Sequence, residues 1–593
     1  MKDFLKFTLA TITGIIISSV ILFFLSIITL FSLSFSESAP TQVDKNSVMV
    51  LNLKGTLSER NQEDPLAFLI GDDYQSYGLN DILSSIRKAK DHENIQGIYI
   101  QAGYLQTGFA SLEEIRQALL DFKKSGKFIV AYADTYTQGL YYLSSVADKI
   151  LLNPKGMIEW KGLAAQPVFY KELLEKVGVE MQVFKVGTYK SAVEPYIATE
   201  MSSANREQIN VYLHSIWNHI LTGVADSRQI GIKQLNQAAD QMLMFHPAET
   251  CVQYGLVDTL IYKNDVRSFL KGQMGLEEED DLPTLGLKAM VNLQKNQPKD
   301  KSGNIIAVYY ATGQIVDFAA ESPLLSSNEP VISANKVIQD LKKLEDNTDV
   351  KAVVLRVNSP GGSAYASEQI WYAVSELKKE KPVIVSMGDY AASGGYYISC
   401  NADTIVAQPT TLTGSIGIFG MFPNTKKLTD KLGINFDVVK TNTYADFGSM
   451  GRGMNDGEKS LMQMYVNQGY DLFLTRCANG RSMTKEAIDK VGQGRVWTGS
   501  NALELGLVDV LGGLDTAIDI AVRKAAVEGY TLVNYPKQSS VLSTLLETSP
   551  GTYLKGHLLS GKAGELYDTF QMLNHWDSYD PLQARLPFDL NIQ

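Results

Sequence analysis

Apolar β-branched runs alternate with helical segments along most of this 593-residue chain. In the stretch 304–410 the apolar runs predict strands at 305–310, 351–357, 382–387 and 403–407. The segments between them predict helices at about 334–345 and 364–379. Strands that alternate with helices are typical of a mostly parallel sheet covered by helices. The pattern therefore predicts an α/β fold.

The chain contains this pattern twice. Segment 112–124, "LEEIRQALLDFKK", resembles 367–379, "SEQIWYAVSELKK", and 137–154 resembles 392–409. Ile115 and Ile370, like Gln138 and Ser393, are separated by 255 positions, and this register holds across nearly a hundred residues. Such self-similarity indicates a duplicated unit. We expect a first repeat domain at 46–270, a linker at 271–303, a second repeat domain at 304–530 and a tail at 531–593.

The N-terminus predicts a membrane anchor. No charged residue occurs from Phe7 to Phe35, and about 20 apolar residues suffice to span a bilayer. The run is longer than the apolar part of a cleavable signal peptide. Lys2 and Lys6 precede it, which keeps residues 1–6 in the cytoplasm and sends the rest of the chain across the membrane. We expect a single uncleaved transmembrane helix at 7–36.

Composition narrows the range of functions. The formal net charge is −11, and basic residues form no separate block, which speaks against nucleic acid as a partner. Three widely separated cysteines match neither a metal-binding pattern nor a disulfide framework. Hydrophobic residues make up 45% of the chain, an ordinary value for a folded protein.

A candidate nucleophile lies in the second copy. The stretch 388–399, "GDYAASGGYYIS", places Ser393 between alanines and glycines directly after an apolar run. Small residues around a serine at a strand end permit the sharp turn that presents a nucleophilic hydroxyl. A serine also needs a base, and no histidine lies within 140 residues of Ser393. Taken alone, such a serine is more often an ordinary turn residue.

Comparison of the two copies supplies a candidate base. Gln138 replaces Ser393 in the first copy, whereas Lys190 of the first copy, in "VGTYKSAVEP", is replaced by Ala445 in the second. One half has the serine without the lysine, and the other has the lysine without the serine, which indicates one site shared between the halves. At the ordinary lysine pKa only about one amine in two thousand is neutral at pH 7. The base must therefore be buried away from carboxylates, and contact with Glu194 would weaken the hypothesis.

A glycine-rich turn completes the candidate site. The stretch "NSPGGS" at 358–363 follows a predicted strand, and the first copy has "GYLQTG" at the matching place. Paired glycines allow backbone N–H groups to point at an oxyanion, so Gly361 and Gly362 are candidate donors.

These motifs, together with "TLTGSIGIFG" at 411–420, resemble signal peptide peptidase A, or protease IV, in its long two-copy form. The resemblance covers nearly the whole chain up to about residue 530. It implies two tandem crotonase/ClpP-like βαβ domains after one transmembrane helix, and a serine protease with a Ser/Lys dyad. Ser393 would be the nucleophile, Lys190 the general base, and Ser415 the residue that orients the lysine. The backbone N–H of Gly394 would form the oxyanion hole with one from the Gly361–Gly362 turn.

The resemblance also implies partners and a location. The substrates would be cleaved signal peptides and other apolar peptides, and neither a metal nor a cofactor would be needed. The chain would form a homotetramer and lie in the bacterial inner (cytoplasmic) membrane, in contact with lipid through its N-terminal helix. Its catalytic part would then lie on the periplasmic side.

Two other interpretations stay open at this point. Crotonase-like folds also bind acyl-CoA thioesters, although a membrane anchor and a lysine set opposite a serine speak against a cytoplasmic cofactor. A catalytically inactive membrane scaffold that binds exported peptides is the second alternative. An intact serine and lysine argue against it.

Overall fold

The computed structural model describes residues 43–61, 77–295, 302–318, 330–537 and 582–585, with residue 300 and scattered positions between 6 and 21. The predicted membrane segment at 7–36 lies mostly outside these residues. Within the described part of the chain, every helix is too short or too polar to span a bilayer.

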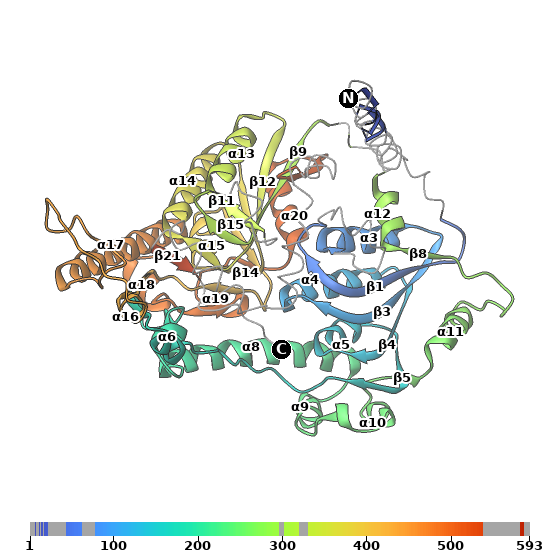
Figure 1. Cartoon of the computed structure of the whole chain (residues 1–593). Helices are drawn as coiled ribbons and strands as arrows, with labels where there is room; N and C mark the ends of the chain where they lie inside the picture. The colour runs from blue at the N-terminus through green and yellow to red at the C-terminus, as the bar shows by residue number, and fades with distance from the viewer. Residues whose placement is uncertain are drawn as a thin grey trace.

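The first repeat forms a parallel sheet in the strand order β2-β1-β3-β4-β5-β7, with β8 paired to β1 (Figure 1). Its strands are β1 (Ser47–Ser58), β2 (Tyr77–Gly78), β3 (Ile95–Gln106), β4 (Phe128–Tyr136), β5 (Lys149–Ile158), β7 (Thr259–Leu260) and β8 (Thr284–Gly286). Its main helices are α3 (Leu79–Asp91), α4 (Phe109–Lys123), α5 (Gln138–Ser144), α8 (Ser203–Arg228), α9 (Ile232–Asp240), α10 (Ala248–Gln253) and α11 (Val266–Gln273).

The second repeat forms a similar sheet in the order β18-β16-β14-β12-β9-β20, with β15 and β19 attached beside β14. Its strands are β9 (Ile305–Thr312), β12 (Val350–Ser359), β14 (Val383–Ala392), β15 (Thr404–Ala407), β16 (Leu412–Gly414), β18 (Val496–Thr498), β19 (Val510–Leu511) and β20 (Thr531–Tyr535). Its helices are α13 (Ala334–Asp346), α14 (Ala364–Glu380), α15 (Gly394–Ser399), α16 (Lys426–Lys431), α17 (Asp456–Arg481), α18 (Lys485–Val491), α19 (Gly499–Glu504) and α20 (Leu514–Ala525).

Both faces of the second sheet are buried, as expected for parallel strands. Along β9, Ala307 and Tyr309 join the core cluster that contains residues of α13 and α14. The alternate positions Ile306 and Val308 join a separate cluster with residues of α20. The nearly continuous apolar character of these strands therefore follows from helices on both sides.

The predicted repeat is confirmed by the order of the elements. The starts of α3 and α13, of β3 and β12, and of α4 and α14 are each separated by 255 positions. The separation falls to 251 at α10 and α19. The strands and helices predicted in the stretch 304–410 are all present, with ends that shift by a few residues.

A third sheet joins the two repeats, and the sequence pattern did not predict it. Its strands run in the order β11-β10-β13-β21-β17-β6. Strand β6 belongs to the first repeat and pairs antiparallel with β17 of the second repeat over six residues. The members are β6 (Glu180–Lys185), β10 (Gln314–Val316), β11 (Val331–Ser333), β13 (Gly361–Ser363), β17 (Phe419–Asn424) and β21 (Leu582–Arg585). Because β6 pairs with β17, the segment after β6 lies against the second repeat. The helices on either side of β6, α6 (Lys171–Val177) and α7 (Glu194–Ile197), lie there as well.

Two predicted boundaries differ from the structure. The stretch 271–303, expected to be a linker, contains β8 and α12 (Leu287–Lys295), because β8 extends the first sheet beside β1. The second repeat continues past residue 530, since β20 pairs in parallel with β9. Most of the remaining tail lies outside the described residues, and β21 is the part of it that the structure describes.

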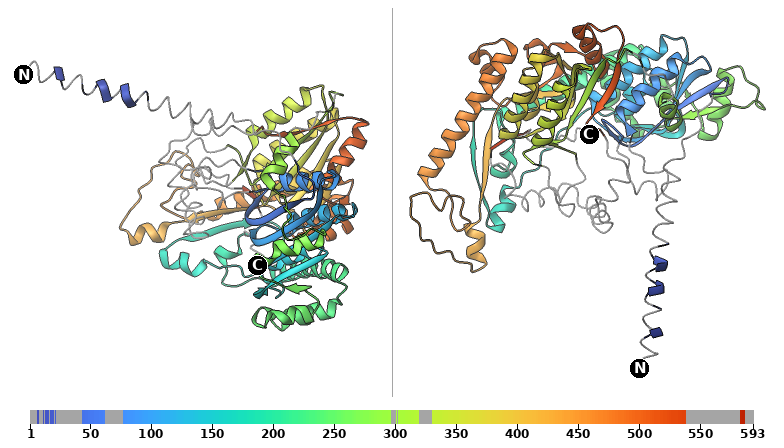
Figure 2. Two further views of the ribbon diagram at one scale, coloured as in Figure 1. Left: turned by 90° about the vertical axis from the view of Figure 1, so that its right-hand side faces the viewer. Right: turned by 90° about the horizontal axis from the view of Figure 1, so that it is seen from above.

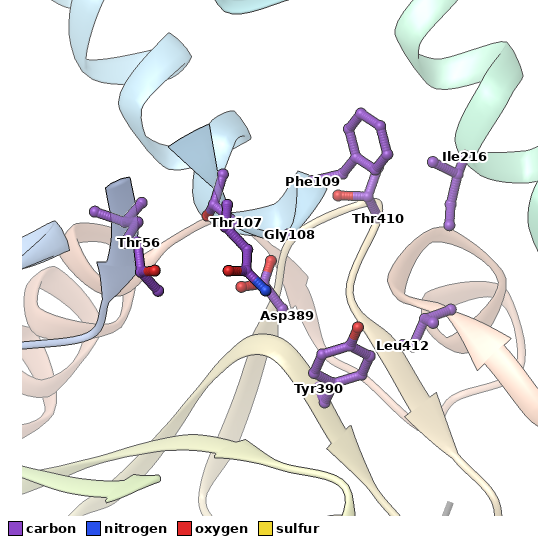
Figure 3. A pocket seen from close by; sticks show the side chains of 11 residues that line it. Thr56, Thr107, Gly108, Phe109, Ile216, Asp389, Tyr390, Thr410 and Leu412 are labelled. Atoms are coloured by element: carbon purple, nitrogen blue, oxygen red, sulfur yellow. The ribbon is translucent and has the colours of Figure 1, made fainter. Parts of the chain in front are cut away.

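A buried ion-pair cluster holds the two repeats together. Arg356, on β12, is fully buried, and its guanidinium group lies 2.9 Å from Glu59 and 2.6 Å from Glu114, both of the first repeat. Asp389 makes a second contact of this kind by accepting hydrogen bonds from the N–H and hydroxyl of Ser111. Figure 3 shows Asp389 pointing toward the start of α4, at a cavity of about 260 Å³ between the repeats.

Candidate active site

Ser393 lies at the junction of β14 and α15. The strand ends at Ala392 and the helix begins at Gly394, so the serine makes the turn alone, with φ 55° and ψ −112°. A non-glycine residue in this region is strained by roughly 1–3 kcal/mol, and such strain is common where a side chain must be presented to a reaction. A hydrogen bond of 2.8 Å from its own N–H to the Gly414 carbonyl holds the turn. The sharp strand-to-helix turn expected from the sequence is present.

Lys190 reaches this serine from the first repeat. It follows β6 and is fully buried. Its Nζ lies 2.7 Å from Ser393 Oγ, although the two residues are 203 positions apart. The same amine donates to the hydroxyl of Ser415 at 3.1 Å and to its carbonyl oxygen at 3.2 Å. The structure thus brings together the predicted serine, lysine and second serine.

The lysine amine has no carboxylate beside it among the described residues. Burial lowers the pKa of Lys190 well below its ordinary value, and no charged neighbour offsets that effect. Glu194, the carboxylate nearest in sequence, instead accepts hydrogen bonds from Ser202 and Asn205 at the start of α8. A neutral amine next to a hydroxyl can accept a proton from it.

Two glycines make room for the lysine, and their role was not predicted. A Cβ added to Gly417 would lie 3.2 Å from Lys190 Cδ. A Cβ added to Gly494, at φ +78°, would lie 2.6 Å from the backbone N and Cα of Lys190. Gly417 belongs to a motif singled out in the sequence, but Gly494 is 304 positions from the lysine and no local pattern marks it. Next to it, the Gln493 carbonyl accepts a 2.8 Å hydrogen bond from the Tyr189 N–H, which fixes the turn before the lysine.

The glycine turn faces the start of α15. Gly361 and Gly362 have φ values of +102° and +159°. A Cβ on Gly361 would lie 2.8 Å from the backbone nitrogen of Gly394, so the turn and the N–H that follows Ser393 are adjacent. The N–H of Gly361 donates to Ser359 Oγ at 3.1 Å. Gly361 and Gly394, two of the predicted oxyanion-hole residues, therefore lie next to each other beside Ser393, whereas a Cβ on Gly362 would meet the backbone of Ile315.

In each repeat, the position that corresponds to the catalytic candidate of the other repeat holds a residue that cannot act as nucleophile or base. Gln138 stands where the first repeat would need a serine, and its side-chain oxygen accepts hydrogen bonds from the N–H groups of Lys161 and Gly162. Ala445, the counterpart of Lys190, is exposed. In the described part of the chain, no group of three or more metal-ligating side chains could hold a metal ion.

Comparison of the sequence with known protein families identifies the family to which the chain belongs. The model of Peptidase family S49 matches residues 121–277 and 375–528, which are parts of the two repeats. The chain belongs to peptidase family S49. A model of Clp protease also matches residues 324–411, a stretch that includes Ser393. The chain is accordingly a serine protease with two S49 domains of ClpP-like α/β fold.

The relatives cover most of the chain. "Protease 4" of Salmonella typhi is 38% identical over 489 residues, which are 81% of this chain and 77% of the relative. "Protease 4" of Haemophilus influenzae is 35% identical over 560 residues, 88% of each chain. "Serine protease SPPA, chloroplastic" of Arabidopsis thaliana is 33% identical over 510 residues, 85% of this chain and 73% of the relative. The S49 relatives thus support the predicted resemblance to signal peptide peptidase A.

Proposed function

We propose that the chain is a membrane-anchored endopeptidase in which Ser393 is the nucleophile and Lys190 the general base. The observation that carries this proposal is the 2.7 Å separation of Lys190 Nζ and Ser393 Oγ in a buried place. Because burial lowers the pKa of Lys190, the amine is available as a base at pH values where an exposed lysine is charged.

The reaction proceeds by acyl transfer. Neutral Lys190 takes the hydroxyl proton as Ser393 Oγ attacks the scissile carbonyl carbon. The N–H of Gly394 and one N–H of the Gly361–Gly362 turn stabilise the oxyanion. The protonated lysine then gives its proton to the leaving amine. A water molecule releases the acyl group by the same exchange, and Ser415 keeps the amine aimed at Ser393 through both steps.

We infer that the substrates are cleaved signal peptides and other apolar peptides at the membrane. The apolar run at 7–36 would act as a single-pass anchor in the bacterial inner membrane, and the positive-inside rule would put both repeats on the periplasmic side. An enzyme anchored in this way meets apolar segments that remain in or near the bilayer after a precursor has been cut. Neither a metal nor a cofactor takes part in the proposed steps.

We also propose that the chain works as a homotetramer. The segment between α16 and α17 extends from the body in a long loop that reaches one end of the molecule (Figure 2). It exposes large apolar side chains, with exposed fractions of 65% for Leu432, 99% for Val439 and 63% for Met450. Exposed apolar surface of this extent is typical of a contact between proteins, and further copies of the chain would cover it.

The test is hydrolysis of a short apolar peptide ester by the purified full-length chain in detergent. We expect Ser393→Ala and Lys190→Ala each to lower kcat/KM by at least about 1000-fold, as for loss of a nucleophile or its base. Lys176→Ala, which removes an exposed lysine of α6, is the control and should leave the rate unchanged. Full activity in both dyad variants would refute the assignment, and an inactive wild type between pH 6 and 10 would favour the scaffold alternative.

A further inference from the structure

A buried amide of α8 lies directly against the segment that carries Lys190. Helix α8 extends from near α6 to α5 and so lies along both repeats (Figure 1). Gln208, near the start of this helix, has an exposed fraction of 1%. Its Nε2 donates to the Tyr189 carbonyl at 3.1 Å and to Ser191 Oγ at 2.9 Å. These residues come immediately before and after Lys190, so one side chain holds the backbone of the candidate base on both sides.

The oxygen of the same amide contacts the second repeat. Gln208 Oε1 accepts a 3.2 Å hydrogen bond from the N–H of Val496, on β18. Val496 pairs with Gly414 of β16. The Gly414 carbonyl in turn accepts a 2.8 Å hydrogen bond from the N–H of Ser393. The amide therefore connects the segment of the candidate base to the turn of the candidate nucleophile, although the two belong to different repeats.

An amide side chain suits both partners of Gln208. The Tyr189 carbonyl needs a donor and the Val496 N–H needs an acceptor, and an amide offers both in one planar group. A carboxylate of the same length would accept from Val496 but could not donate to Tyr189. Nε2 also donates to Asn205 Oδ1 at 3.1 Å, one turn earlier on α8, which orients the amide plane. Loss of the amide would leave the Tyr189 carbonyl and the Val496 N–H without this partner.

The position of Lys190 depends on such contacts. Residues 186–193, all of which the structure describes, form neither a strand nor a helix, since β6 ends at Lys185 and α7 begins at Glu194. The lysine amine lies at the end of a flexible four-carbon chain. A small backbone shift would therefore move Nζ away from Ser393 Oγ, which now lies 2.7 Å from it. Misplacing a catalytic group by about 1 Å can cost about 100-fold in rate.

We propose that Gln208 is a positioning residue that holds Lys190 at the distance that proton transfer from Ser393 requires. This inference rests on the proposed roles of Ser393 and Lys190. Gln208 bonds to the neighbours of the lysine rather than to Nζ or Oγ, so it acts through the lysine backbone. Its loss should lower kcat and leave KM near the wild-type value. A residue that served stability alone would change neither constant in protein that is still folded.

Hydrolysis of the peptide ester by full-length variants tests the proposal. We expect Gln208→Leu, which removes the amide, to lower kcat about 100-fold with little change in KM. Gln208→Glu keeps the acceptor for Val496 but loses the donors toward Tyr189 and Ser191, so it should lower kcat about as far. The matched controls are Asn210→Leu and Asn210→Asp, because Asn210 is an exposed amide of the same helix. Both should hydrolyse the ester like wild type.

The pH profile gives a readout that a purely structural role would not change. Gln208→Glu places a carboxylate beside the segment of Lys190, which favours the charged amine and raises its pKa. The acid limb of kcat/KM should therefore move to higher pH in this variant, and an unchanged limb would contradict the proposal. The charged groups near this segment are the same in every variant: Lys185, Glu194, Glu207 and Arg495.

Ser191→Ala decides the question if the Gln208 variants do not fold. It removes the hydroxyl that accepts from Gln208. We expect kcat to fall several-fold, and a wild-type kcat would contradict the proposal. Where Gln208→Leu does fold, adding Ser191→Ala to it should cause no further loss, because both changes break the same link.

The outcomes separate this inference from the proposed function. If Ser393→Ala is inactive but Gln208→Leu keeps the wild-type kcat, the positioning role is wrong and the proposed function stands. A loss in Gln208→Leu that lies in KM alone would overturn the positioning role as well. If Ser393→Ala hydrolyses the ester like wild type, both proposals fail.

Discussion

Gly494 packs directly against the backbone of Lys190, so closely that an added Cβ would lie 2.6 Å from the lysine Cα. The two residues belong to different repeats. The segment after α18 thus packs against the lysine backbone and fixes its position in the site. The Gly494 N–H donates to the Ile416 carbonyl at 2.7 Å. This hydrogen bond links the segment after α18 to the segment that also contains Ser415.

Gly494→Ala should lower kcat about 100-fold by displacing Lys190, because misplacing a catalytic group by about 1 Å can cost that much. The measurement is kcat and KM with the peptide ester. Gly433→Ala is the matched control, since Gly433 also has a positive φ, of +72°, but an added Cβ there meets open space. If both variants lost the same activity, backbone strain alone would explain the loss, and displacement of Lys190 would not be its cause.

Activity should rise with pH through the pKa of Lys190 in the folded enzyme. In the proposed mechanism the neutral amine is the active form, so protonation at low pH would remove the base. Because burial lowers this pKa well below the ordinary 10.5, the acid limb of kcat/KM should lie well below pH 10.5. Glu194→Gln is the control and should leave the limb in place, since Glu194 faces α8. A limb at the ordinary lysine value would contradict a buried neutral amine.

Lys190→Met should raise the thermal midpoint of unfolding at pH 7 while it abolishes hydrolysis. Between the pKa of Lys190 in the folded protein and 10.5, the unfolded chain binds a proton at this lysine and the folded chain does not. The stability of wild type therefore falls as pH falls, by about 1.4 kcal/mol per pH unit from this group.

Differential scanning fluorimetry from pH 7 to 10.5 checks this expectation. The advantage of Lys190→Met over wild type should shrink as the pH rises toward 10.5. Lys176→Met is the control, because Lys176 is exposed and its replacement should give no pH-dependent difference. An advantage of Lys190→Met that stays constant with pH would show that the buried amine is not the cause.

Arg356→Met should destabilise the chain by about 3–5 kcal/mol, because it leaves the carboxylates of Glu59 and Glu114 buried without their cation. Chemical denaturation measures the loss. Adding Glu59→Gln and Glu114→Gln to the same variant should recover much of it, since no uncompensated charge then remains. Lys343→Met, which breaks an exposed pair with Asp340, should change stability by less than about 1 kcal/mol. A loss in Arg356→Met no larger than this would mean that the cluster does not hold the repeats together.

The two main sheets were predictable because their strands are buried on both faces, as along β9, and their helices repeat with a fixed separation. The third sheet was not predictable. Strand β13 has three residues and β21 has four, and each is defined by partners that lie far away in sequence. No local run of apolar residues specifies such strands.

Some residues of the candidate site were likewise predictable from the sequence, and others were not. The complementary distribution of Ser393 and Lys190 between the copies pointed to a shared site, and the structure brings the two side chains together. Gly494 could not be found, since its effect depends on contact with a residue 304 positions away. The role of Glu194 also needed coordinates, because a carboxylate four positions from Lys190 could have turned toward it or away.

The proposed base lies in one repeat and the proposed nucleophile in the other, which has a consequence for biosynthesis. Translation delivers Lys190 roughly two hundred codons before Ser393, and β17, which receives β6, is later still. A ribosome-bound or truncated chain that holds only the first repeat contains an amine with nothing to activate. Under the proposed mechanism, hydrolysis can begin only when both halves have been synthesised, folded and docked, so an unfinished chain cannot cut other proteins.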